Sequence, residues 1–248
     1  MDTQSNDYGQ QNFTLPHDVV PLPSQGIFYK NRKKAIKVGY LTAADENIIM
    51  AGGSDLTLNL LRAKIYEPDM RVEDLIEGDV EAILIFLRNT AFGPKYKISS
   101  IDPETGKKFF TEIMLDELDF RKPSQDPNED GSFTIKLPKS NATVKVKPLT
   151  FKEIGEINKL ADQYPTGRVA PKVTWKLQKQ IISVEGDSEQ GTINRFVEGL
   201  PIMDSKFIRN FINENEPQLD LRKVVMTPSG EKVDVEIAFG VEFFRVFF

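Results

Sequence analysis

The stretch GDVEAILIFLRNTAFG, residues 78–93, is apolar around much of the circumference of the helix that it predicts. One face of this helix carries apolar residues at the spacing i, i+3, i+4 and i+7, namely Val80, Ile83, Leu84 and Leu87. Asp79 is a suitable N-cap, and Gly93 followed by Pro94 ends a helix. The pattern indicates a buried central helix around which the other segments pack.

Short helices and one strand are predicted before this central helix. Residues 35–41 follow a basic run and are predicted to form a short strand. Thr42 is a suitable N-cap for a helix over residues 43–50, with Asp45 three positions later. Two glycines end that helix, a second helix follows, and residues 72–76 are predicted to form a third.

After Gly93 the apolar period changes from helical to alternating, which predicts three β-hairpins in the remaining chain. Their turns lie at residues 102–106, 138–141 and 227–232. The first and third turns are alike, since DPETGK resembles TPSGEK. Either the chain contains a weak internal repeat of helices plus a hairpin, or the turns are alike because Pro and Gly recur in turns generally.

Helical patterns return in the second half of the chain. The sequence TFKE at residues 150–153 is a capping box that begins a helix. A helix or a strand surrounds Trp175, and two short helices are predicted over residues 192–200 and 204–213, the second capped by Asp204. The predicted fold class is α+β, with short helices packed around a central apolar helix and two or three β-hairpins.

Composition along the chain predicts three regions. Residues 1–21 are polar and are predicted to form a flexible N-terminal arm. The polar loop RKPSQDPNEDGS, residues 121–132, is the predicted boundary between two modules. An N-terminal helical and hairpin module covers residues 22–122, and a C-terminal module of the same kind covers residues 133–248.

Residue types exclude most kinds of catalytic and metal site. The chain has no cysteine and a single histidine, His17, which excludes thiol nucleophiles, disulfides, cysteine-based zinc sites and sites with two histidines. The nucleotide-binding glycine motifs, G-x-S-x-G and H-E-x-x-H are absent. We therefore expect no enzyme activity, no metal and no cofactor. No apolar run approaches the ~18 residues of a membrane helix, so we expect no membrane span.

The charge balance bears on nucleic acid as a partner. The net charge is −5, which provides no overall basic field. Residues 30–37 form a local basic run, whose lysines either protect a strand edge from aggregation or contact phosphates. We expect no nucleic-acid partner, and keep a nucleic-acid-binding or tape-measure accessory module using this run and the hairpins as the alternative.

Two aromatic segments are candidates for contact with a protein partner. LPSQGIFY near the N-terminus is either a strap over the core or a docking motif. The C-terminal run FGVEFFRVFF must be covered, either by this chain's own core or by a groove on a partner, with its last two residues the stronger partner contacts. The residues predicted to contact a partner are Leu22, Pro23, Phe28, Tyr29, Phe243, Phe244, Phe247 and Phe248.

Five segments in this order resemble the baseplate hub and hub assembly protein family of T-even-like contractile-tailed bacteriophages. They are LPSQGIFY, YLTAADENIIM, GDVEAILIFLRNTAFG, PLTFKEIGEI and FGVEFF, and they span residues 22–244. Relatives in this family carry cysteines at two hairpin turns that resemble zinc ribbons. Residues 98–106 and 225–230 contain no cysteine, so the resemblance implies two ribbon-like hairpins without zinc.

The resemblance implies a role in assembly. It implies contacts with other baseplate hub proteins in the host cytoplasm, as an assembly factor or as a minor hub subunit, and no covalent chemistry. A place in the baseplate of the finished virion tail is compatible with either role. The oligomeric state does not follow from the sequence.

Overall fold

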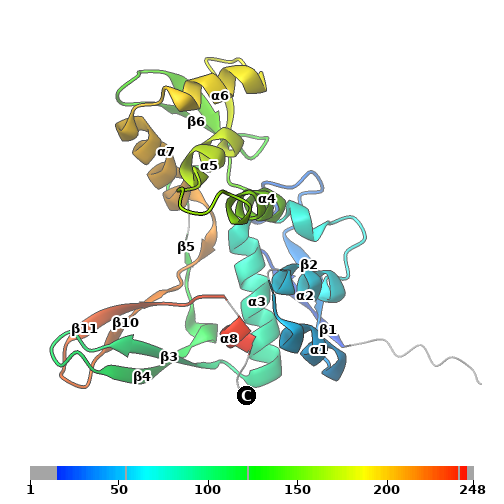
Figure 1. Ribbon diagram of the computed structural model, residues 1–248. Coiled ribbons are helices and arrows are strands. Elements are labelled where there is room, and N and C mark those ends of the chain that lie inside the picture. The colour runs from blue at the N-terminus through cyan, green and yellow to red at the C-terminus, as the bar shows by residue number, and fades with distance from the viewer. Residues whose placement is uncertain (1–15, 54, 122, 240, 245–248) are drawn as a thin grey trace, which may run out of the picture.

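The predicted central helix is α3, Glu77–Phe92, which crosses the larger of two lobes (Figure 1). The computed structural model describes residues 16–53, 55–121, 123–239 and 241–244. Most side chains of α3 are buried, as the apolar pattern predicts. The fold is α+β, as expected, with short helices around α3 and several small antiparallel sheets.

Short elements cover α3 in the N-terminal part of this lobe. Their bounds are β1 His17–Pro21, β2 Ala35–Gly39, α1 Ala43–Ala51, α2 Leu56–Lys64 and the 3-10 helix η1 Val72–Asp74. Thr42 and Asp45 form a capping box at the start of α1, which confirms the predicted helix start. The predicted flexible arm, residues 1–21, is too long, because β1 pairs with β2 along its whole length. Residues 1–15 lie outside the described residues.

Two β-hairpins from distant parts of the chain lie side by side and form a prong that projects from the larger lobe (Figure 1). The hairpins are β3 Lys95–Ile101 with β4 Lys108–Met114, and β10 Arg222–Met226 with β11 Lys232–Glu236. Asp102 in the first turn accepts hydrogen bonds from Ser229 in the other turn, from its N–H at 3.2 Å and its Oγ at 2.8 Å. The two similar turns therefore touch, and the internal repeat stays a prediction.

A smaller lobe is inserted between these hairpins in the chain. It holds the sheet β6 Phe133–Lys136, β7 Thr143–Val146 and β8 Ile181–Val184, with the helices α4 Phe151–Asp162, α5 Lys172–Gln180, α6 Gln190–Glu198 and α7 Ile202–Asn215. Trp175 lies in α5, just before β8, so the segment around it contains both a helix and a strand. The predicted capping box at Thr150 and Glu153 begins α4.

The two lobes do not coincide with the predicted modules of residues 22–122 and 133–248, because the chain returns to the larger lobe after α7. β9, Gln218–Leu219, pairs with β5, Phe120–Arg121, and packs against α3. Leu219 and Ile237 belong to the core of the larger lobe. We call residues 16–121 and 218–244 the body lobe, and residues 123–217 the inserted lobe. The remaining described elements of the body lobe are the 3-10 helix η2 Leu115–Glu117 and the short helix α8 Val241–Phe244.

Two predicted helix caps are also wrong, since both aspartates bond to distant segments. α3 begins after Ile76 and α7 begins after Pro201. Asp204 accepts the backbone N–H groups of Lys139 at 2.7 Å and Ser140 at 2.8 Å, in the turn between β6 and β7. The partners of Asp79 are described below. Each carboxylate lies inside the first helical turn, where the helix dipole also favours a negative charge.

Candidate partner-binding site

Residues 22–34, which we call the strap, connect β1 to β2 through a series of tight turns. The N–H of Leu22 donates to the carbonyl of Lys34 at 2.8 Å and closes the loop. Gly26 has a φ of +73°, and a Cβ there would lie 2.3 Å from the carbonyl oxygen of Lys33. Only glycine fits such a close approach of two backbone segments, so Gly26 fixes the path of the strap.

Asp79 attaches the strap to the start of α3. Its fully buried carboxylate accepts the backbone N–H of Ser24 at 2.9 Å, together with the hydroxyls of Ser24 and Tyr29. The Tyr29 hydroxyl in turn accepts the N–H of Ile76 at 3.1 Å, at the N-terminus of the helix. Burial raises the pKa of Asp79, while the hydrogen bonds from Ser24 and Tyr29 oppose that rise. Burial and the neighbouring Asp79 raise the pKa of Tyr29 well above its ordinary value.

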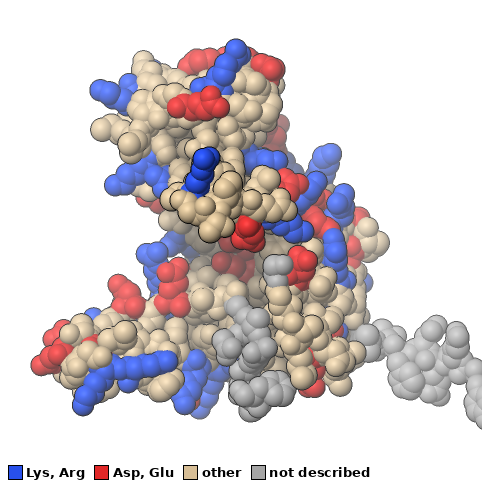
Figure 2. All heavy atoms as spheres, viewed as in Figure 1, with Lys and Arg blue, Asp and Glu red and all other residues tan. Residues whose placement is uncertain are grey.

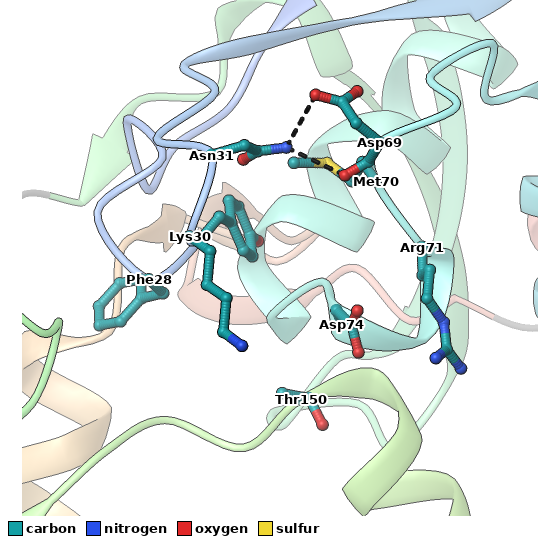
Figure 3. A pocket seen from close by; sticks show the side chains of 9 residues that line it. Phe28, Lys30, Asn31, Asp69, Met70, Arg71, Asp74 and Thr150 are labelled. Atoms are coloured by element: carbon teal, nitrogen blue, oxygen red, sulfur yellow. Dashed lines mark hydrogen bonds between the residues drawn. The ribbon is translucent and has the colours of Figure 1, made fainter.

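A hollow of about 400 Å³ lies beside the strap (Figure 3). Its walls combine apolar and charged side chains from three parts of the chain: Phe28, Tyr29, Lys30, Asn31, Asp69, Met70, Arg71, Asp74 and Thr150. Asn31 donates to the carbonyl of Asp69 at 3.2 Å and joins the strap to the segment before η1. Two cations and two carboxylates line the hollow, so its charge does not select an anionic or a cationic ligand.

The strap also contacts the inserted lobe. Phe28 is half buried and packs against the hydrophobic cores of both lobes. Arg32 donates to the carbonyl of Ile27 at 2.8 Å and to that of Glu129. A Cβ on Gly131 would lie 2.9 Å from the carbonyl oxygen of Ile27, so the loop and the strap approach closely. The strap therefore contacts both lobes and links them.

The structure places most of the predicted partner contacts in the core of this chain. Leu22, Tyr29, Phe243 and Phe244 are buried in the core of the body lobe, and their contact with a partner stays a prediction. Pro23 and Phe28 are half buried at the strap. Phe247 and Phe248 lie outside the described residues. Of the two explanations for the aromatic C-terminus, the chain's own core holds for its described phenylalanines.

Arg88 shows how α8 is held against α3. The Arg88 guanidinium lies 5.8 Å from the centroid of the Phe243 ring and 5.2 Å from that of Tyr96. The same group donates to the carbonyls of Gly93 at 2.8 Å and Lys95 at 3.1 Å. The buried Arg88 guanidinium therefore provides hydrogen bonds to carbonyl groups at the end of α3 and the start of β3, and it packs against the Phe243 ring of α8.

Two carboxyl groups lie unpaired at the seam between the lobes, and no pattern in the sequence indicated them. Glu81 on α3 and Glu216 after α7 each have a buried oxygen without a hydrogen-bond partner in the described chain. Burial, Glu77 and Glu236 raise the pKa of Glu81 to about 8. Burial and the charges of Glu77, Glu81 and Asp79 raise the pKa of Glu216 to about 8, against an opposing effect of Lys176.

These two carboxyl groups border different hollows. Glu216 borders a hollow of about 210 Å³ together with Gln180 and Lys176, whereas Glu81 borders a different one of about 90 Å³. Within the part of the chain that the structure describes, no group of three His, Cys, Asp or Glu residues is placed to hold a metal ion.

Exposed apolar residues form surfaces that the sequence reasoning missed. On the prong they are Ile101, Phe110, Val224 and Met226, and at the start of α7 they are Ile202, Met203 and Phe207. One indication was present in the sequence, because Phe109 and Phe110 are adjacent in a predicted strand. Successive side chains of a strand point to opposite faces, so one of these two must face outward.

The comparisons with known proteins identify one family. A family model described as T4 bacteriophage base plate protein matches residues 28–245, which include both lobes and the prong. No curated protein and no solved structure matches the chain. Among the described residues, no helix combines the length and the apolar character needed to cross a membrane.

Proposed function

Because the chain belongs to the T4 bacteriophage base plate protein family, we propose that it acts in assembly of the baseplate hub. Family membership supports a structural or assembly role in the phage baseplate, with other baseplate components as partners. The finer role is that of an assembly factor or a minor hub subunit that binds other hub proteins in the host cytoplasm. It works through protein contacts and without enzyme activity.

The observation that carries this proposal is apolar surface exposed on both lobes. Phe110 on the prong is 62% exposed, and Ile202 at the start of α7 is 85% exposed. The space-filling view shows the inserted lobe and the prong as separate projections (Figure 2). Grouped exposed apolar side chains mark protein contact surfaces. Two such surfaces on separate projections suit a protein that holds two partners in a fixed relation.

The internal contacts of the strap support the same function. Asp79 fixes the strap to α3, and Arg32 fixes it to the inserted lobe, so the two lobes present their surfaces in one arrangement. A pre-organised scaffold loses less conformational entropy when it binds. In this proposal the strap and α3 hold the shape of the protein, and the exposed surfaces contact its partners.

The nucleic-acid alternative has less support. Lys33, in the basic run, forms ion pairs with Glu67 and Asp69. Burial disfavours the charge of Glu67, but its bonds to Lys33 and the Lys37 N–H lower its pKa, so the acid stays paired. Part of the run is therefore neutralised within the chain. Binding of duplex or single-stranded DNA at low ionic strength would revive this alternative.

The proposed function is tested with purified hub proteins of the same phage. The full chain should co-elute with at least one of them in size-exclusion chromatography. In cells infected with phage that lack this protein, hub intermediates should fail to form, and the full chain supplied in trans should restore them. Mass spectrometry of purified particles then separates a minor subunit, present in virions, from an assembly factor, absent from them. Normal hubs in the absence of the protein would refute the proposal.

A further inference from the structure

The outer face of the β3–β4 hairpin carries two neighbouring apolar side chains in water. Ile101 pairs with Lys108 in the strand register, so Phe110 is the diagonal neighbour of Ile101 on the same face. Ile101 is 64% exposed and Phe110 is 62% exposed, whereas the adjacent Phe109 is buried. Pairs of large apolar residues on one sheet face indicate a contact surface more strongly than isolated ones.

Three lysines and one carboxylate, Glu112, lie on the same face as these apolar side chains, so the charge of the face is positive on balance. The ammonium groups of Lys97 and Lys108 lie 4.9 Å and 5.4 Å from the centroid of the Phe110 ring. Lys95 lies on the same face by strand alternation. Within the described chain, these three lysines form no ion pair. Figure 2 shows Lys and Arg side chains gathered along the β3–β4 side of the prong.

We propose that this face docks an extended acidic and apolar segment of another baseplate protein, with Phe110 at the centre of the contact. Apolar side chains of the segment cover Phe110 and Ile101. Its carboxylates pair with the lysines around the ring, where removal of water strengthens the attraction. The inference rests on the proposed function, which identifies the segment as part of another baseplate protein. It adds the acidic and apolar character by which this face recognises the segment.

A protein segment fits this face better than nucleic acid. The ammonium groups already lie within cation–π distance of the Phe110 ring, where a stacking base would compete with them. The aliphatic Ile101 gains from contact with apolar side chains and has no ring on which a base can stack.

The outer face of β10–β11 provides a matched control on the same prong. Val224 is 62% exposed and Met226 is 57% exposed, so this face has a similar apolar character. Its charges balance, since the register pairs Arg222 with Glu236, and Lys232 and Asp234 add one charge of each sign. Substitutions there change exposed apolar area without changing a basic surface.

The first test uses defined probes with the full chain. An acidic peptide of alternating Glu and Leu residues, its counterpart with Lys in place of Glu, and a single-stranded DNA oligonucleotide are titrated by fluorescence anisotropy. The acidic peptide should bind, and Phe110→Ser or Lys97→Glu with Lys108→Glu should weaken it by about tenfold or more. The control Val224→Ser should leave the affinity within about twofold. Circular dichroism checks that each variant is folded.

The outcomes separate this inference from the proposed function. If purified hub proteins bind wild type and Phe110→Ser equally, the docking face is wrong and the hub function stands. If the acidic peptide binds through Phe110 but no hub protein binds, the face is right and the hub function is wrong. Absence of peptide binding, equal binding of the Lys counterpart, or tighter binding of the oligonucleotide would each overturn the docking proposal.

Discussion

Asp79 and Glu81 lie two residues apart on α3, but only the carboxyl group of Asp79 has hydrogen-bond partners for its buried oxygens. Two positions correspond to about 200° around a helix, so the side chains leave α3 on opposite sides. Asp79 meets the strap and accepts three hydrogen bonds. Glu81 meets the seam with the inserted lobe, where one of its oxygens is buried without a partner. Burial alone therefore does not tell whether a carboxyl group stabilises the fold.

The two sides of α3 differ in how their buried acids are satisfied. On the strap side, a satisfied carboxylate fixes a loop 55 residues away in sequence. On the seam side, burial raises the pKa values of two carboxyl groups that each have an oxygen without a hydrogen-bond partner in the described chain. Satisfied buried polar networks specify one arrangement, whereas unpaired ionisable groups are costly when they become charged.

The largest effect is expected from Asp79→Ala. This change leaves the buried hydroxyls of Ser24 and Tyr29 without their acceptor, and should lower the free energy of unfolding by about 3 kcal/mol. The control Ser24→Ala removes one donor and should cost about 1 kcal/mol. Urea denaturation followed by circular dichroism measures both. Equal losses for the two variants would show that Asp79 is not the centre of the network.

The next effect tests the seam side at Gly78. A Cβ there would lie 2.1 Å from the carbonyl oxygen of Pro217, so Gly78→Ala forces β9 away from α3. We expect a loss of about 2 kcal/mol from this overpacking. The matched control is Gly155→Ala in α4, where a Cβ would meet nothing within 4 Å. That variant should gain up to about 1 kcal/mol, because alanine favours a helix more than glycine does. Stabilisation by both substitutions would contradict the close contact.

The third effect is a dependence of stability on pH. Glu81 and Glu216 have folded pKa values of about 8, above the ordinary value of 4.5, so the folded state holds extra protons between these pH values. Their stabilising contribution is complete below pH 4.5 and is lost as pH rises through 8. The slope reaches about 1.4 kcal/mol per pH unit for each group. Urea titrations from pH 5 to 9 should show this fall, and Glu81→Gln with Glu216→Gln should flatten it. An unchanged slope in the double variant would assign the effect elsewhere.

The smallest effect concerns the hydrogen bonds by which Arg32 links the strap to the inserted lobe. A lysine cannot reach the carbonyls of Ile27 and Glu129 together, so Arg32→Lys should cost about 1 kcal/mol or less. Hydrogen exchange of the loop around Gly131 should become faster, with no change in β3 or β4. Lys34→Ala, an exposed neighbour in the strap, serves as the control and should leave that loop protected. Faster exchange in both variants would mean that the strap responds to any change in charge.

Sequence reasoning found the elements whose evidence is local. The i, i+3, i+4, i+7 spacing indicated α3, capping boxes located the starts of α1 and α4, and alternation with Pro and Gly turns located the hairpins. It misplaced Asp79 and Asp204 as caps, because a carboxylate in a first helical turn satisfies the same local pattern whether it bonds its own helix or a distant loop. It did not show that Leu22, Tyr29, Phe243 and Phe244 are buried, because the residue type alone does not distinguish a core side chain from one that contacts a partner.

The sequence by itself determined the buried helix, the hairpins, the lack of cysteine chemistry and the resemblance that the family match supports. Only the tertiary structure decided that the chain returns from the inserted lobe to the body lobe, that α8 packs beside Arg88, and that Phe110 rather than Phe109 faces water. The physical reason is that periodicity and caps depend on neighbours within about one helical turn. The partner of a buried charge or the cover of an aromatic ring depends on segments that meet only in the folded chain.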